Sequence, residues 1–432
     1  MKIAIAGYGQ EGESSYNYYA MQDEHQITIV DENQPSRELP SDVPTIIGHG
    51  AFGALQGFDI VIRSPGIAPS KIVTDGKVWS STNEFFEKCP ADIIGVTGTK
   101  GKGTTASLIA SIFEAAGKTT WLVGNIGVPA LDTLEHIGPE DIVVFEMSSF
   151  QLWDIERSPH TAVVLLIEPD HLNVHADMED YVNAKGHIRA FQKDDDICIY
   201  HPTNHYSRQI ALSNSSGKSL RYGVPDDGGV YERDGQFIQK GEVICSLDAL
   251  QLIGQHNVEN ACAAITVARS YGLSIGAIED GLRNFKGLPH RLELVRNYSG
   301  VEYYNDSFSS APPATVAAVK SFAQPEILIV GGIDKGGDFS ILIETLKQQP
   351  NIKEVVLIGQ TRQNLHAQMQ TAGVPGRLTI LDAQTMPEIV AYCAQTAQPG
   401  DVVILTPGSA SFDMFKDFYD RGDQFRNNVN AL

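Results

Sequence analysis

Residues 94–109 read IGVTGTKGKGTTASLI, a β-branched run that breaks into a loop rich in glycine and lysine. A helix is expected to follow, beginning near Thr104. This order predicts a phosphate-binding loop, because glycines let the backbone curl so that its N–H groups point inward, and the positive end of the helix dipole adds to the attraction. We therefore expect the chain to bind a nucleoside triphosphate.

Lys102 is expected to reach the β and γ phosphates, and a hydroxyl of Thr104 or Thr105 is available to Mg²⁺. The spacing departs from GxxxxGK[ST], because a GxxxxxGK run begins at Gly95 and Gly103 follows Lys102. A glycine turn that binds nothing is the alternative interpretation. The candidate nucleotide-binding residues are Gly98, Thr99, Lys100, Gly101, Lys102, Gly103, Thr104 and Thr105.

Length and composition narrow the class of protein. A chain of 432 residues predicts two or three domains, and 42% hydrophobic with 20% charged residues is typical of a globular protein. The formal net charge of −21 argues against nucleic acid or an anionic membrane as a partner. The five cysteines form no CxxC pair, and no apolar run has the length of a signal peptide or membrane span. We expect a cytoplasmic protein.

The first residues predict a nucleotide-binding βαβ unit. A buried-strand pattern leads into GxGxxG at Gly7, Gly9 and Gly12, and a second strand at 26–30 ends in Asp31. The pattern is weak alone, since such a turn also serves only to pack a helix on a strand, and Asp31 either holds a ribose or merely ends its strand. A further strand at 59–63 runs into SPGI at 64–67.

The middle of the chain places polar residues at expected strand ends. The strand at 142–145 ends in Glu146, and the strand at 162–167 leads into EPDHLNVH, which contains His171. Because ligands gather at the carboxyl edge of parallel sheets, we expect both residues near Lys102. The alternatives are a solvated strand-end carboxylate and an ordinary loop histidine. Residues 215–252 alternate polar and β-branched or aromatic residues, which predicts appended antiparallel strands.

The last third predicts another α/β unit. Strands are expected at 326–330, 354–358, 378–381 and 401–405. Two of them lead into loops of small and polar residues, GGIDKGGDF at 331–339 and TPGSASFDMF at 406–415, which allow a ligand to approach closely.

These motifs occur together in the order of one known family, and the chain resembles the Mur ligases. The matching strings are GTKGKGTT (98–105), GNIG (124–127), EMSSFQ (146–151), the DH of EPDHLNVH (168–175), NAKGHI (183–188), GQHNVENA (254–261), LPHR (288–291), NDS (305–307), GGIDKGGDF and TPGSASFDMF. SSFQ and the ending PGSASFDMF…RGDQF most resemble the member that adds glutamate to a UDP-sugar bearing alanine.

The resemblance implies an α/β protein of three domains. Residues 1–90 would form a Rossmann-like domain that binds the UDP-sugar, with no nicotinamide. Residues 91–287 would form a P-loop ATPase-like domain with a small added β-sheet, and residues 288–432 a Rossmann-like domain for the incoming amino acid.

The implied activity is an ATP-dependent, ADP-forming amide ligase. It would join D-glutamate to UDP-N-acetylmuramoyl-L-alanine through an acyl phosphate, in peptidoglycan precursor synthesis, and would act as a monomer. One alternative is a related ligase that uses L-glutamate or another amino acid. A second is a nicotinamide-dependent oxidoreductase built on the Gly7 loop, which would leave Lys102, Glu146 and Lys185 without a role.

The resemblance also implies the catalytic groups and two Mg²⁺ ions. Glu146 and His171 would each ligate one ion, and Thr104 would replace the hydroxyl that relatives carry at the position of Gly103. Lys185 matches a lysine that the family carbamylates, which would turn an amine into an anionic ligand, although a surface lysine is the plain alternative. Asn125 would polarise the acyl phosphate.

Further residues are implied as substrate contacts. Asn257 and Asn260 would reach the adenine, Arg291 the ATP phosphates and Asp306 the ribose, unless Arg291 and Asp306 only form a salt bridge. Where most members read DSKxT, this chain has Phe308 in place of the lysine, which leaves the glutamate enantiomer open. The implied UDP-substrate contacts are Gly9, Gln10, Glu11, Gly12, Asp31, Ser64, Asn125 and Ser148. The implied amino-acid contacts are Ser310, Lys335, Ser411, Phe412 and Phe418.

Overall fold

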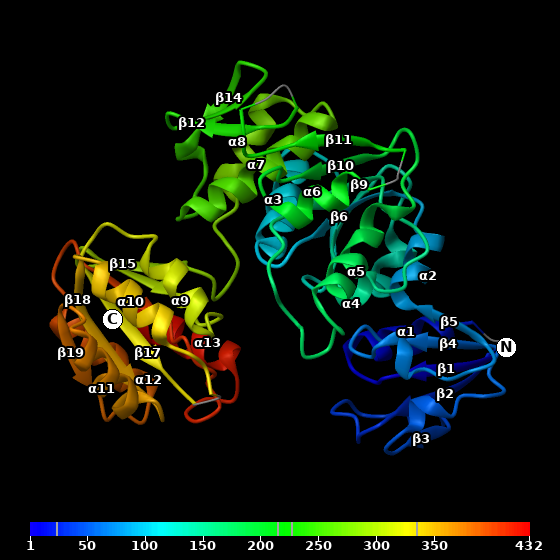
Figure 1. Ribbon diagram of the computed structural model, residues 1–432, viewed down its shortest axis with the longest axis horizontal. Coiled ribbons are helices and arrows are strands. Elements are labelled where there is room, and N and C mark those ends of the chain that lie inside the picture. Colours follow the sequence, from blue (N-terminus) through cyan, green and yellow to red (C-terminus); the bar gives the residue numbers. More distant parts are fainter. Residues whose placement is uncertain (23–24, 214–215, 226–227, 334–335) are drawn as a thin grey trace. The chain divides into compact units, whose positions relative to one another are not determined.

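The computed structural model describes residues 1–22, 25–213, 216–225, 228–333 and 336–432 (Figure 1). The chain forms two compact units. One comprises Met1–Leu250 with Val258–Phe285, and the other Gln251–Asn257 with Lys286–Leu432. The boundaries of the three expected domains stay predictions.

The first unit begins with a five-stranded parallel sheet of order β3-β2-β1-β4-β5. Ile3, Ile5 and Val61 are fully buried in it, as expected of parallel strands covered on both faces. Its elements are β1 (Lys2–Ala6), α1 (Gln10–Ala20), β2 (Gln26–Asp31), β3 (Thr45–Ile47), β4 (Ile60–Arg63), β5 (Lys77–Ser80) and α2 (Ser81–Lys88), with short 3-10 turns at Ala51–Gly53 and Pro69–Lys71.

The same unit contains a six-stranded parallel sheet of order β11-β10-β9-β6-β8-β7. Its strands are β6 (Asp92–Thr97), β7 (Thr120–Gly124), β8 (Ile142–Glu146), β9 (Thr161–Val164), β10 (Ile197–Tyr200) and β11 (Lys218–Arg221). The helices are α3 (Lys102–Ala115), α4 (Ser149–Leu152), α5 (Met178–Ala190), α6 (His205–Ala211), α7 (Gln255–Ser270) and α8 (Ile275–Asn284), with a 3-10 helix η3 (Ala130–His136). The first residues of α7 belong to the other unit.

Two expectations need correction. The antiparallel strands expected within 215–252 are present as β12 (Tyr231–Arg233), β13 (Gln236–Gln239) and β14 (Glu242–Ser246), but β11 pairs parallel with β10 at the edge of the larger sheet. Helix α3 begins at Lys102, two residues earlier than expected, because Gly101 adopts the left-handed conformation at the N-cap and the helix follows at once.

The second unit has one mixed sheet of order β15-β16-β20-β17-β18-β19, in which the β15–β16 pair is antiparallel. Helices α9 to α13 accompany it. Its elements are β15 (Glu293–Tyr298), β16 (Val301–Asn305), α9 (Pro312–Val319), β17 (Glu326–Gly331), α10 (Ser340–Gln348), β18 (Ile352–Ile358), α11 (Arg362–Ala372), β19 (Arg377–Ile380), α12 (Met386–Thr396), β20 (Val402–Leu405) and α13 (Phe418–Asn430). The α/β class with a small added sheet is thereby confirmed.

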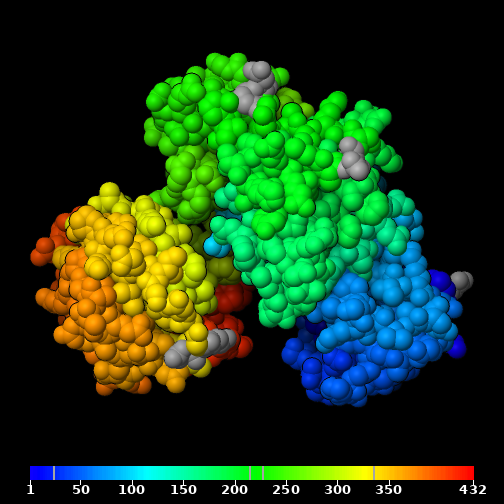
Figure 2. Space-filling view, in the orientation of Figure 1, coloured from blue at the N-terminus to red at the C-terminus, as the bar shows by residue number. Residues whose placement is uncertain are grey.

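The topology brings the expected active residues of the first unit to one edge. Strands β8, β6 and β9 are neighbours and run parallel, so the loops that follow them leave the same edge of the sheet. Within this unit the N-terminal residues, blue in Figure 2, lie directly against the cyan and green ones. Because both parts belong to one compact unit, the side-chain contacts between them are part of its structure.

Candidate functional site

The loop after β6 has the backbone that phosphate binding requires. Gly98 and Gly101 have φ values of 152° and 83°, which side chains rarely tolerate. A Cβ atom on Gly98 would lie 2.7 Å from Leu165, and one on Gly101 would lie 2.4 Å from the Oδ1 atom of Asn260. A residue with a side chain would therefore collide with its neighbours at either of these two positions, and Asn260 lies against the loop.

The side chains of this loop differ in exposure. Lys100 is exposed and lies 3.5 Å from Glu168, whereas Lys102 is largely buried and donates to the carbonyl oxygen of Thr99 at 3.1 Å. Gly103 and Thr104 are half-buried in the first turn of α3, and Thr105 is fully buried. The Oγ1 atom of Thr105 has no hydrogen-bond partner among the described residues.

Lys102 is paired with the carboxylate that ends β8. Its Nζ atom lies 3.8 Å from the Oε1 atom of Glu146, whose side chain is only 3% exposed. Within the described part of the chain, this Oε1 atom accepts no hydrogen bond. A buried carboxylate oxygen in that state is suited to a hard cation such as Mg²⁺.

The GNIG loop lies beside the same carboxylate. The backbone N–H of Asn125 donates to the carbonyl oxygen of Glu146 at 3.1 Å, and the Asn125 side chain is exposed. A Cβ atom on Gly124 would lie 2.4 Å from that carbonyl oxygen. The close approach holds Asn125 at the edge where Lys102 and Glu146 lie.

Lys185 is a buried amine rather than a surface lysine. It is 1% exposed and donates to the carbonyl oxygen of Gly98 at 2.9 Å and to the Oγ1 atom of Thr97 at 3.3 Å. Burial, assisted by the charge of Lys102, holds the pKa of Lys185 well below its ordinary value. This shift is in the direction that carbamylation needs, and the interpretation of Lys185 as a surface lysine is wrong.

His171 is held by its loop but remains open to solvent. It has a positive φ of 54°, its side chain is 48% exposed, and its ring centroid lies 4.9 Å from that of Phe150. The backbone N–H of His175 donates to its carbonyl oxygen, and the fully buried His175 ring bonds Asp180 and Ser149 at 3.0 and 2.9 Å. Our sequence analysis did not single out His175.

The N-terminal loops are tied together by the residues expected at the UDP-substrate. Asp31 accepts from the backbone N–H of Tyr8 at 2.9 Å, and Ser64 donates to the carbonyl oxygen of Gly7 at 2.7 Å. A Cβ atom on Gly12 would lie 2.0 Å from that oxygen, so only glycine fits there. Gly9 and Gln10 are exposed at the start of α1.

Glu11 and Ser148 already have protein partners. Glu11 accepts from Ser81 at 2.9 Å and from Gln151 at 3.4 Å, and burial raises its pKa. Ser148 caps α4 through reciprocal bonds with Gln151. These contacts give both residues a structural role, which the sequence analysis did not foresee.

Asn257 and Asn260, near the start of α7, are both buried, and Asn257 donates to the carbonyl oxygen of Ile253 at 2.8 Å.

Arg291 and Asp306 belong to the second unit. Asp306 accepts from Ser309 at 2.5 Å and from Thr406 at 3.0 Å, and burial raises its pKa to about 6.

Arg291 lies on an aromatic surface. Its guanidinium carbon is 3.5 Å from the ring centroid of Phe308, and the Phe308 ring meets that of Phe418 edge to face at 5.2 Å. The Phe308 ring thus supports the Arg291 guanidinium through a cation–π contact.

The described residues expected at the amino acid come from three places in the second unit: Ser310 follows β16, Ser411 and Phe412 follow β20, and Phe418 begins α13. Ser411 is buried, whereas Ser310 and Phe412 are exposed, and Lys335 lies outside the described residues. The sequence analysis missed Arg421 of α13, which is 1% exposed and bonds Ser307 and the carbonyl oxygen of Ser409.

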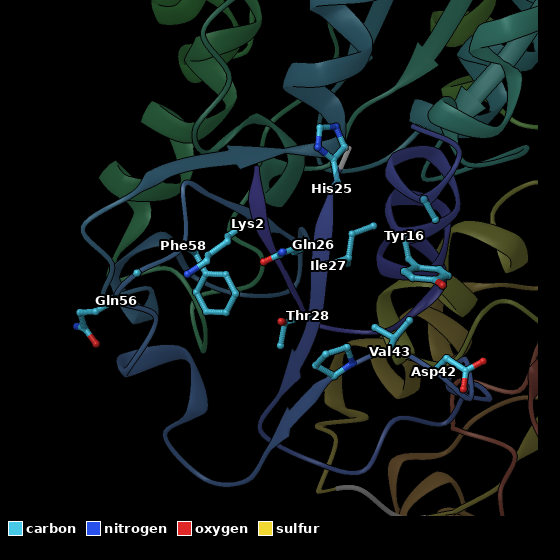
Figure 3. Close-up of a pocket in the computed structure, with 13 residues that line it drawn as sticks. Lys2, Tyr16, His25, Gln26, Ile27, Thr28, Asp42, Val43, Gln56 and Phe58 are labelled. Atoms are coloured by element: carbon cyan, nitrogen blue, oxygen red, sulfur yellow. The ribbon is translucent and has the colours of Figure 1, made fainter. Parts of the chain in front are cut away.

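A pocket of about 720 Å³ lies elsewhere, at the start of β1 and β2 (Figure 3). Lys2, Tyr16, Gln26 and Phe58 line it, and none of the expected site residues does. Among the described residues, no three His, Cys, Asp or Glu side chains form a metal-binding group, and no helix in that part of the chain has the length and apolarity to cross a membrane.

Known protein families and structures agree with the fold described above. The Mur ligase middle domain matches residues 96–268, and the Mur ligase glutamate ligase domain matches residues 290–408. The chain belongs to the Mur ligase family. It is 34% identical to UDP-N-acetylmuramoylalanine--D-glutamate ligase of Clostridium kluyveri over 100% of this chain and 97% of that protein, and further relatives that are 32–37% identical carry the same name.

Solved structures share the fold at lower identity. MurF of Acinetobacter baumannii has a TM-score of 0.64 at 17% identity, covering 99% of this chain and 90% of that one. MurF of Thermotoga maritima in complex with ADP has a TM-score of 0.60 at 16% identity, covering 99% and 94%. These likenesses support the fold expectation.

Proposed function

We propose that this protein is an ATP-dependent, ADP-forming ligase that joins D-glutamate to UDP-N-acetylmuramoyl-L-alanine in peptidoglycan synthesis. The observation that carries the proposal is the pairing of Lys102 with the buried Glu146 at a phosphate-binding loop, with one carboxylate oxygen lacking a hydrogen-bond partner in the described structure. The substrates are those in the name of relatives that match the chain over its full length.

The chemistry explains why such groups are needed. A carboxylate resists a nucleophile because it is negatively charged and has no usable leaving group. The γ phosphoryl of ATP passes to the alanine carboxylate oxygen, the bond to the β phosphate breaks, and ADP leaves. The glutamate amine then attacks the carbonyl carbon, phosphate leaves, and the amine loses a proton. Crowded negative charge makes positioning and cations the main catalytic needs.

Lys102 is proposed to hold the β and γ phosphates, and Asn125 to donate to the acyl phosphate. The turn of Gly98 to Gly103 would provide backbone N–H groups. The site fits Mg²⁺, since Glu146 offers a buried oxygen and Lys185 a buried amine whose pKa is lowered. Two ions would be held by Thr104, Glu146, His171 and carbamylated Lys185, and would supply positive charge beside the phosphates.

The remaining contacts follow the family resemblance. Asn257 and Asn260 are proposed at the adenine, Arg291 at the phosphates and Asp306 at the ribose. The loops around Gln10, Asp31, Ser64 and Ser148 would bind the UDP-substrate. Ser310, Lys335, Ser411, Phe412 and Phe418 would bind glutamate. We also propose a cytoplasmic monomer without nucleic-acid or membrane partners, in keeping with its net charge of −21.

The test measures phosphate release and product mass with ATP, Mg²⁺, the UDP-sugar and either enantiomer of glutamate. Phosphate release should require all three substrates, and D-glutamate should be preferred. A preference for L-glutamate would replace the proposed substrate. Oxidation of a nicotinamide without ATP turnover would overturn the ligase proposal.

A further inference from the structure

Arg63 ends β4 with a charged side chain that is fully buried. A cation is rarely buried unless its donors are satisfied, and removing its partners costs several kcal/mol. The mechanism proposed above gives Arg63 no role. Its contacts therefore need an explanation of their own.

One side of the guanidinium holds the SPGI loop. The Nη1 atom donates to the carbonyl oxygens of Ser64, Pro65 and Ile67 at 3.3, 3.1 and 2.7 Å. One nitrogen thus donates to three carbonyl oxygens of the turn 64–67. The hydroxyl of Ser64 also donates to the carbonyl oxygen of Gly7. The loop is fixed on both sides.

The other side holds the segment that follows Glu146. The Nε and Nη2 atoms donate to the two carboxylate oxygens of Asp154 at 2.7 and 2.6 Å, and Nη2 also donates to the carbonyl oxygen of Phe150 at 3.0 Å. Phe150 lies in α4, whose N-cap is Ser148. Asn83 fixes Asp154 further by donating to its carbonyl oxygen at 2.9 Å.

We propose that Arg63 is a positioning residue that holds the two halves of the UDP-substrate site in register. This inference rests on the proposed function, because Ser64 and Ser148 are its expected substrate contacts. Arg63 joins their two segments through a single planar group. The geometry of a guanidinium permits this simultaneous bonding, and an ammonium cannot reproduce it.

The consequence should appear in substrate binding. Without Arg63 the three loop carbonyls lose their common donor and turn toward water, so Ser64 and Ser148 would no longer face one ligand in a fixed relation. The phosphate loop does not contact Arg63 in the bonds described above, so ATP binding should change little.

The experiment compares Arg63→Gln, Arg63→Lys and Asp154→Asn with Arg157→Gln. Arg157 pairs with Glu87 of α2 and joins the same two parts of the chain, but it is exposed and bonds no substrate loop, which makes it a matched control. The measurements are kcat, the KM for the UDP-sugar, the KM for ATP, and the melting temperature.

Arg63→Gln should raise the KM for the UDP-sugar by about tenfold or more while the KM for ATP stays within about twofold. Arg63→Lys should also raise the KM for the UDP-sugar, although the charge is kept. Asp154→Asn should raise this KM by a smaller factor. Arg157→Gln should leave both constants unchanged. If Arg63 variants do not fold, Asp154→Asn carries the test.

A melting temperature that falls while both KM values stay normal would show a purely structural role and overturn the proposal. Equal rises in both KM values would do the same. Failure of the proposed function would instead be seen in the unmodified protein, as no turnover with the UDP-sugar.

Discussion

The Nζ atom of Lys102 lies 3.8 Å from the Oε1 atom of Glu146, so a partly exposed lysine pairs with the buried carboxylate that ends β8. Each partner offsets the charge of the other in the absence of ligand. If a polyphosphate binds here as proposed, Lys102 would gain a stronger anionic partner, and the carboxylate would be left available to a cation. The pair would then couple nucleotide binding to metal binding.

Lys102→Ala should lower kcat by more than about 100-fold, because one buried phosphate contact contributes about 3 kcal/mol. The fold should persist, since Lys102 retains partial exposure. Phosphate release and circular dichroism measure the two effects. Lys118→Ala, an exposed lysine after α3, should retain normal turnover. Near-normal activity of the Lys102 variant would contradict the proposed role of this lysine in holding the phosphates.

Lys185→Ala should lose activity and regain part of it when short carboxylic acids are added. Removal of the buried Lys185 side chain would leave a cavity beside Gly98 and Thr97. A small carboxylate bound there would replace the oxygens of a carbamate. Turnover against acetate concentration measures the rescue, and Lys102→Ala should show none. An active Lys185→Ala without added acid would contradict the carbamate proposal.

The phosphate loop was predictable because its needs are local. Gly98 and Gly101 must adopt positive φ, and the β-branched run before them predicts the strand that precedes the loop. Glu146 was predictable as a strand-end residue, and it ends β8. His171 lies well beyond the end of β9 at Val164, although the loop that contains it leaves the same edge of the sheet.

The buried cations were not predictable. Arg63 bonds Asp154 from 91 residues away, and Arg421 bonds Ser307 from 114 residues away. No local sequence pattern predicts such pairs, because only the tertiary structure brings the two residues together. The same holds for Glu11, whose partner Gln151 lies 140 residues along the chain.

Glu326→Gln should change the pH dependence of stability in the second unit. Glu326 is fully buried and accepts from Asn351 at 2.8 Å, while its Oε2 atom has no partner in the described chain. Burial raises its pKa from 4.5 to about 8. The folded state therefore keeps a proton that the unfolded state releases, and stability falls as pH rises from about 4.5 to about 8.

Glutamine imitates the protonated carboxyl at every pH, so the two proteins should be similar at about pH 5. At about pH 8.5 the variant should be the more stable by about 4–5 kcal/mol. Urea unfolding of the second unit at both pH values measures the difference. Glu344→Gln, on the exposed face of α10, should follow the unmodified protein. Parallel pH profiles for Glu326→Gln and the unmodified protein would disprove the assigned pKa.

Phe308→Leu should raise the KM for ATP by a few-fold with little change in kcat. The Phe308 ring supports the guanidinium of Arg291 at 3.5 Å and meets Phe418 at 5.2 Å. An exposed cation–π contact contributes about 0.5–1 kcal/mol and an aromatic pair about 0.5–1.5 kcal/mol, which together correspond to a change of about fivefold to seventyfold if both were lost. Leucine keeps part of the packing, so the lower end is expected.

Steady-state kinetics with ATP varied at saturating UDP-sugar and glutamate measures this effect. Phe191→Leu, a ring of similar exposure after α5, is the control and should leave the constants unchanged. If Phe308→Leu changed only the KM for glutamate, Phe308 would belong to the amino-acid site rather than to the support of Arg291. The two outcomes separate cleanly, because Arg291 is proposed at the phosphates and Phe418 at glutamate, and Phe308 touches both.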